Sequence, residues 1–199
     1  DLLYNVVGSI AAMFTFLNTA MNSSTQRYLS LAVGRNDAQQ LHKIFNVSFV
    51  IHALIGIVIM LACEVFGTWF INHKMVIPEG REMAVFWTFQ LSLLAAFLSI
   101  IMVPYDALVI SRERMSTFAN ISIFDVFFKL IVAFIISVVS FDRLVFYSLL
   151  IVLSQFVVAL IYSSYCKRHF EECSFKFYRF DSLYKEMTVF ASWGLLGHI

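Results

Sequence analysis

Residues 44–71 read IFNVSFVIHALIGIVIMLACEVFGTWFI and contain one formally charged side chain, Glu64. A helix rises about 1.5 Å per residue, so this run is long enough to cross the roughly 30 Å hydrocarbon core of a bilayer. Lipid offers no partner for open backbone groups, and the run does not alternate as a barrel strand would. The sequence therefore predicts a transmembrane helix here.

The whole chain shares this apolar character. Its 199 residues are 60% hydrophobic and 14% charged, and the mean hydropathy is +0.82. Soluble domains are roughly 45–50% apolar and about 25% charged. The formal net charge of +1 provides no cationic surplus to hold a phosphate backbone, so we expect no nucleic-acid partner. The composition indicates a polytopic helical membrane protein.

Charged residues divide the chain into apolar runs. We expect spans within residues 2–31, 44–71, 83–110, 118–139 and 144–165, a connecting loop over 166–186, and the start of a further span at 187–199. The predicted fold class is all-α, a transmembrane bundle of about five spans plus the start of a sixth. The chain opens at Asp1 without a signal peptide and closes inside an apolar run, so we expect a fragment of a longer protein.

The breaks between runs carry helix-capping and turn residues. Gly34 is expected to end the first helix in a left-handed conformation. Asp37 should cap the next helix, with Gln40 three residues later in a capping-box-like pair. Pro78 and Gly80 mark a short loop between the second and third spans.

Lysine and arginine are unevenly divided between alternate loops. One side has only Lys74, Arg81 and Arg143, and the other has Arg27, Arg35, Lys43, Arg112, Arg114, Lys167, Arg168, Lys176, Arg179 and Lys185. Cytoplasmic loops carry the excess of these residues. The loops near residues 34 and 112 and the 166–185 loop are therefore predicted to be cytoplasmic.

Asp125 and Lys129 are the most specific polar signal in the spans. Their i,i+4 spacing places both on one helix face, where they can pair. Ionisable groups at membrane depth are costly and are usually paired or face an aqueous interior. One interpretation is a structural ion pair that fixes helix packing. The other is a polar route, in which the pair or Lys129 alone meets an anionic group.

Weaker polar signals lie in three other spans. Asn18 and Asn22 are one turn apart, and packing and a cavity wall are equally good interpretations. For His52, a neutral ring bonded to a neighbouring helix is favoured over a protonation switch. Asp106 is expected to snorkel or bond a loop, and Pro104 should bend its helix as a transporter hinge would.

Signs of covalent chemistry are missing. The odd set of cysteines, Cys63, Cys166 and Cys173, has no paired spacing for a disulfide framework. Cys166, His169 and Cys173 lack a fourth metal ligand, and the two intervening basic residues would repel a cation. No hydrolase, zinc-protease or nucleotide-binding motif is present. We expect neither an enzyme nor a bound metal or cofactor.

A series of short motifs carries a family resemblance. It runs LYNVVG at 3–8, NTAM at 18–21, TQRYL at 25–29, VPYDA at 103–107, SRERM at 111–115, IFD at 123–125 and KL at 129–130. In this order and spacing, the series resembles the lipid-linked oligosaccharide flippases of the multidrug/oligosaccharidyl-lipid/polysaccharide exporter superfamily. O-antigen and capsule exporters are the most similar branch. The resemblance is good to about residue 130 and looser beyond it.

The resemblance implies two six-helix bundles, with this chain holding helices two to six of the first and the start of helix seven. It implies alternating-access transport of an undecaprenyl-pyrophosphate-linked glycan across the bacterial cytoplasmic membrane, among membrane lipids and with H⁺ or Na⁺ coupling left open. By position, Arg27, Lys129 and Arg112 are the cations that would attract the pyrophosphate or sugar acids. Asp106 departs from the uncharged residue expected at its position.

Two rival functions remain. A cation-coupled drug or metabolite exporter of the same fold would use Asp125, with His52, as a proton or sodium site. A membrane-embedded glycan polymerase or acyltransferase would need an exposed catalytic loop, and the predicted outer loops are short.

Overall fold

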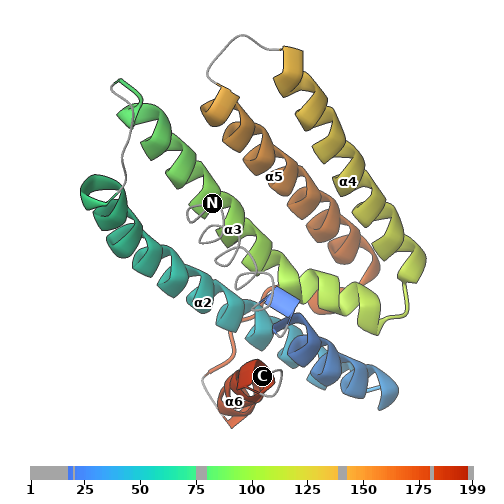
Figure 1. Cartoon of the computed structure of the whole chain (residues 1–199). Helices are drawn as coiled ribbons and strands as arrows, with labels where there is room; N and C mark the ends of the chain where they lie inside the picture. Colours follow the sequence, from blue (N-terminus) through green and yellow to red (C-terminus); the bar gives the residue numbers. More distant parts are fainter. Residues whose placement is uncertain (1–17, 20, 75–79, 139–142, 180–181, 197–199) are drawn as a thin grey trace. The chain divides into compact units, whose positions relative to one another are not determined.

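The computed structural model describes residues 18–19, 21–74, 80–138, 143–179 and 182–196 (Figure 1). The described residues are helical except for short connections, and no strand occurs among them. The all-α fold class is thereby confirmed for this part of the chain.

Residues 18–19 and 21–34 belong to the first helical stretch, and the earlier part of the first expected span lies outside the described residues. The later elements are α2 (Ala38–His73), α3 (Glu82–Ser111), α4 (Met115–Val138), α5 (Arg143–His169), the short 3₁₀ helix η1 (Glu171–Cys173) and α6 (Ser182–Leu196). The final helix thus begins at Ser182, ahead of the expected start at 187, and α5 continues to His169.

Four of these helices are long and apolar enough to cross a membrane. The candidate spans are Ala38–Ile71, Glu82–Ser111, Met115–Ile136 and Leu144–His169. They coincide with the second to fifth runs expected from sequence. Their length and composition indicate a membrane protein.

The chain divides into two compact units, and each is described by itself. The first unit comprises residues 1–52, 103–115 and 166–199, and the second comprises 53–102 and 116–165. Both α2 and α3 therefore contribute one part of their length to each unit.

The second unit exposes large apolar side chains along all four of its helical segments. They include Val58, Phe66, Trp87, Phe127, Leu130, Phe134, Leu149 and Phe156. Monomeric soluble proteins rarely expose apolar patches beyond a few hundred Å². In a bilayer the same side chains are solvated by lipid tails, so their exposure agrees with the membrane assignment.

Two glycines let α2 and α3 approach closely within the second unit. A Cβ atom at Gly56 would lie 2.9 Å from the ring of Phe97, and one at Gly67 would overlap the ring of Phe89. Helix interfaces in membranes use small residues in this way, because dispersion contacts and not hydrophobic burial drive association there.

The turn into α2 corrects one prediction. Gly34 remains within the helix, and Asn36 takes the left-handed conformation with φ 52°. The Asn36 N–H donates to the Val33 carbonyl and the Asp37 N–H donates to the Ala32 carbonyl, which is the Schellman pattern. Asn tolerates this backbone region better than most residues, so the helix runs two residues further than glycine alone suggested.

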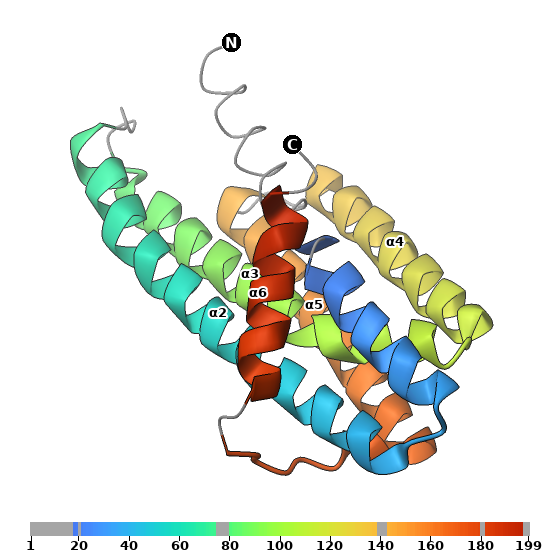
Figure 2. The same cartoon turned by 90° about the horizontal axis from the view of Figure 1, so that it is seen from below.

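The predicted cap of α2 is confirmed. The Gln40 backbone N–H donates to Asp37 Oδ1 over 2.9 Å. This bond satisfies one of the amide groups that the first turn of a helix leaves without a partner. The chain reverses direction at this turn, as Figure 2 shows.

Candidate functional site

The predicted ion pair forms on α4 in the second unit. Lys129 Nζ lies 2.6 Å from Asp125 Oδ2. The side chains are 41% and 24% exposed, so the pair is partly withdrawn from the surface. Asp125 Oδ1 is buried and has no hydrogen-bond partner among the described residues.

The two faces of α4 differ sharply. At about 100° per residue, Asp125 falls on the same stripe as Ile121 and Val132, which are the buried positions of this helix. The opposite face carries the exposed side chains Ile123, Phe127, Leu130 and Phe134. Asp125 therefore lies on the packed side of α4, and Lys129, 41% exposed, lies at the edge of that side.

A second polar cluster lies in the first unit. Asn22 Nδ2 donates to Asp106 Oδ2 over 2.5 Å, and Gln26 Nε2 donates to Asn22 Oδ1 over 2.7 Å. Asp106 thus bonds a side chain of another helix, contrary to the expectation that it would snorkel or bond a loop. Asn18 Oδ1, one turn before Asn22, is buried without a partner among the described residues.

His52 behaves differently from the favoured expectation. Its Nδ1 atom is hydrogen-bonded to the Ser48 carbonyl of the same helix, 2.7 Å away, and not to a neighbouring helix. Its Nε2 atom is buried and has no partner within the described part of the chain.

Pro104 is buried inside α3, which remains helical on both sides of it. The hinge role of Pro104 stays a prediction.

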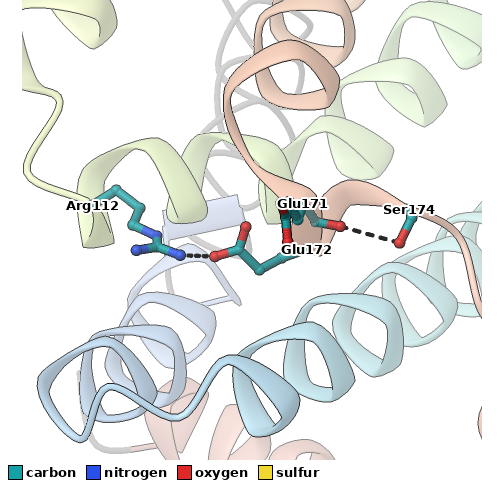
Figure 3. A network of polar contacts seen from close by, with 4 residues as sticks. All are labelled: Arg112, Glu171, Glu172 and Ser174. Carbon is teal, nitrogen blue, oxygen red and sulfur yellow. Dashed lines mark hydrogen bonds and ion pairs between the residues drawn. The ribbon is translucent and has the colours of Figure 1, made fainter.

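The two arginines proposed for substrate binding have different surroundings. Arg27 is exposed on the first helical stretch. Arg112 forms an ion pair with Glu172, as Figure 3 shows, and its guanidinium lies 5.7 Å from the centre of the Phe170 ring. Glu172 is 7% exposed, so Arg112 neutralises a buried carboxylate.

Sequence reasoning missed a side chain that holds the segment after η1. Asn46 of α2 is buried, its Nδ2 atom donates to the Ser174 carbonyl over 3.2 Å, and its Oδ1 atom accepts from the Lys176 N–H over 2.8 Å. The same Nδ2 atom also donates to the His42 carbonyl over 2.9 Å. We call residues 174–178 the docked segment. The Asn46 amide thereby binds two backbone groups of this segment, the Ser174 carbonyl and the Lys176 N–H.

His42 adds a second attachment for the docked segment. Its two ring nitrogens lie 2.8 Å from Tyr178 Oη and 2.9 Å from Ser174 Oγ. In the sequence, a polar residue within an apolar run was the available signal for Asn46, and a histidine just before that run was the signal for His42. Neither signal indicates which residue, more than a hundred positions away, will be the partner. The contacts of Asn46 and His42 with the docked segment could therefore not be predicted.

Two cavities open beside the docked segment. One, of about 1520 Å³, is polar and includes residues of the α2 start, the α3 end and the docked segment, among them Lys43, Arg114 and Lys176. The other, of about 840 Å³, is lined mainly by aromatic side chains, including Phe45, Phe49 and Tyr105.

Cys166 and Cys173 come together at the end of α5. Both are buried free thiols. The hydrogen bond of Cys173 with Cys166, together with burial, keeps the Cys173 thiol protonated and raises the pKa of Cys173. A raised pKa keeps the thiol protonated and unreactive, as expected of a structural cysteine.

Among the described residues, no three His, Cys, Asp or Glu side chains gather as metal ligands would.

No protein-family model, curated protein or solved structure matches this chain.

Proposed function

We propose that this chain is part of a transporter that moves an undecaprenyl-pyrophosphate-linked oligosaccharide across the bacterial cytoplasmic membrane by alternating access. The family resemblance supplies the substrate class. The observation that carries the proposal is the ion pair between Asp125, on the packed stripe of an otherwise apolar helix, and Lys129 at the edge of that stripe.

The chemistry of the pair suits an anionic lipid-linked substrate. An ammonium group forms charge-assisted hydrogen bonds to phosphate oxygens, and these are about twice as strong as neutral ones. Before substrate binds, Asp125 is the counter-ion that makes Lys129 tolerable at membrane depth. In the proposed cycle, the pyrophosphate takes over part of the contact that Asp125 makes with Lys129.

The cluster around Asn22 suits the sugar part of such a substrate. Amide groups donate to and accept from hydroxyl groups, and carboxylates accept from them. Asn18 Oδ1 is buried without a described partner, and Asn22 is already held by Gln26 and Asp106. Within the first unit, taken by itself, Asn18 and Asn22 are proposed to hydrogen-bond sugar hydroxyls, and Asp106 fixes the orientation of the Asn22 amide.

The test replaces Lys129 by Ala in the full-length protein in cells. We expect surface glycan to fall strongly while the amount of protein in the membrane stays unchanged. Phe127→Ala, two residues away on the exposed apolar face of α4, is the matched control and should leave surface glycan intact. Full complementation by Lys129→Ala would remove the proposed role.

A double variant separates substrate binding from a purely structural ion pair. Removing one partner of a buried pair leaves an uncompensated charge, whereas removing both is often tolerated. If the pair is only structural, Asp125→Ala/Lys129→Ala will restore transport lost in Lys129→Ala. If Lys129 binds the pyrophosphate, the double variant will stay inactive although the protein remains folded.

One observation favours a second candidate function, a cation-coupled exporter. Asp125 Oδ1 is buried without a described hydrogen-bond partner, and a carboxylate oxygen of this kind can take up a proton or bind Na⁺. Transport of a cationic dye, coupled to a proton or sodium gradient and abolished by Asp125→Asn, would favour this function over glycan transport.

A further inference from the structure

The two cavities of the first unit adjoin each other. Both are lined by Phe170, Glu171 and Ser174, so their walls meet at the segment that follows α5. The polar cavity and the aromatic cavity therefore form neighbouring compartments of opposite character within a single unit.

The change from polar to apolar lining follows the helix axes. At the start of α2, the cap residue Asp37 and the helical residues up to Lys43 except Leu41 line the polar cavity, and Phe45 and Phe49 line the aromatic one. At 1.5 Å per residue, Phe49 lies about 18 Å along the axis from Asp37. That distance is comparable to the step from the headgroup region of a bilayer into one leaflet of its hydrocarbon core.

The end of α3 repeats the same order independently. Tyr105 lines the aromatic cavity, about two turns before α3 ends at Ser111, and Arg112 and Arg114 in the turn that follows line the polar cavity. Two helices that run in opposite directions thus present their charged residues at one end and their aromatic residues deeper within the spans. A molecule with a charged head and an apolar tail matches this order.

The polar cavity contains charges of both signs. Arg112 and Glu172 neutralise each other. The other charged residues of the lining are three basic side chains, Lys43, Arg114 and Lys176, and three acidic ones, Asp37, Glu113 and Glu171. A headgroup with only negative charge would meet the three carboxylates, whereas a headgroup with a phosphate and an ammonium group has a partner for both signs.

We infer that these cavities bind one phospholipid whose headgroup has a phosphate and a primary ammonium, as in phosphatidylethanolamine. The basic side chains, with Lys167 at the edge of the aromatic cavity, bind the phosphate, and the carboxylates accept hydrogen bonds from the ammonium. The aromatic cavity receives the upper part of an acyl chain. This inference rests on the membrane assignment and is independent of the proposed transport.

The experiment uses the full-length protein in bilayer discs with equal amounts of phosphatidylethanolamine, phosphatidylcholine and phosphatidylglycerol. Lipid that stays bound after transfer to detergent is identified by native mass spectrometry. We expect phosphatidylethanolamine to be retained preferentially, because phosphatidylcholine cannot donate hydrogen bonds from its quaternary ammonium and phosphatidylglycerol lacks an ammonium group.

Variants at exposed lining residues test each compartment. Arg114→Ala/Lys176→Ala should reduce retention by about tenfold, because two charge-assisted contacts are lost. Lys185→Ala, an exposed lysine outside both cavities, is its control. Phe175→Ala should reduce retention through the aromatic cavity, and Phe177→Ala, in the same segment but outside that lining, should not.

The inference is overturned by any of three results. These are retention of phosphatidylglycerol or phosphatidylcholine equal to that of phosphatidylethanolamine, no retained lipid, or equal retention by the lining and control variants. Measuring surface glycan for the same variants keeps this result separate from the transport proposal. Loss of lipid with normal glycan, for example, supports the lipid site and leaves the transporter proposal unaffected.

Discussion

The two units of this chain differ in the contacts that hold each of them together internally. In the second unit, the hydroxyls of Ser92, Ser148 and Ser163 bond a carbonyl of their own helix, while glycines make room for phenylalanine rings. In the first unit, side chains bond residues far away in sequence, as Asn46 does with Ser174 and Lys176.

This difference follows from what surrounds each unit. Lipid tails are as apolar as the side chains they touch, so a unit immersed in them gains its cohesion from close fit. The docked segment has backbone groups without helical partners, and these must be satisfied when they are covered. In the first unit, Asn46 satisfies two of these backbone groups, and His42 bonds the side chains of Ser174 and Tyr178. The second unit should therefore be sensitive to added bulk, and the first to lost polar contacts.

The largest expected effect comes from Asn46. Replacing it by Leu removes the bonds to the docked segment and takes the side-chain partner from the part-buried Ser174 carbonyl and Lys176 N–H, so the free energy of unfolding should fall by about 3 kcal/mol. Thermal unfolding of the full-length protein in detergent measures the change, and hydrogen exchange at residues 174–178 should rise with it. Asn120→Leu, at an exposed position of α4, is the control. Equal effects of the two substitutions would contradict the assignment.

Arg112 should have the next largest effect. Arg112→Met leaves the buried Glu172 carboxylate without its cation and should cost about 2 kcal/mol, less than a fully buried pair because the arginine side chain is 34% exposed. Adding Glu172→Met should recover most of that loss in the same unfolding assay. The exposed Arg35→Met provides the control. A double variant less stable than Arg112→Met would rule out this account.

Gly67 tests the second unit. Gly67→Val introduces a side chain where the Phe89 ring already lies, so we expect a loss of about 1.5 kcal/mol from overpacking. Gly34→Val is the matched control, since nothing lies within 4 Å of its Cβ position and it is also helical. If both valines change the unfolding midpoint equally, close fit is not what holds α2 to α3.

The smallest effect is expected at Asp37. Asp37→Ala removes the acceptor for the Gln40 N–H and should destabilise the start of α2 by about 1 kcal/mol. Asp37→Ser keeps a capping oxygen and should retain most of the stability. Equal unfolding midpoints for Asp37→Ser and Asp37→Ala would contradict the capping role of Asp37.

Local features could be predicted from sequence because their partners are near in the chain. The Asp37 cap and the Asp125–Lys129 pair join residues three and four apart, so helix geometry alone brings them together. The left-handed residue at the end of the first helix was placed wrongly. Gly34 and Asn36 both accept that conformation, and the chain continues its helix to the later one.

The sequence by itself determined the membrane character, the all-α class and the approximate bounds of four spans. Length and hydropathy are sufficient for these, since lipid permits few alternatives to a helix. Only the tertiary structure decided that Asn22 meets Asp106, that Arg112 meets Glu172 and that Asn46 holds the docked segment. The spans are apolar on almost every side, so no stripe in the sequence indicates which faces meet. Contacts between distant residues depend on how the helices pack, and hydropathy does not encode that packing.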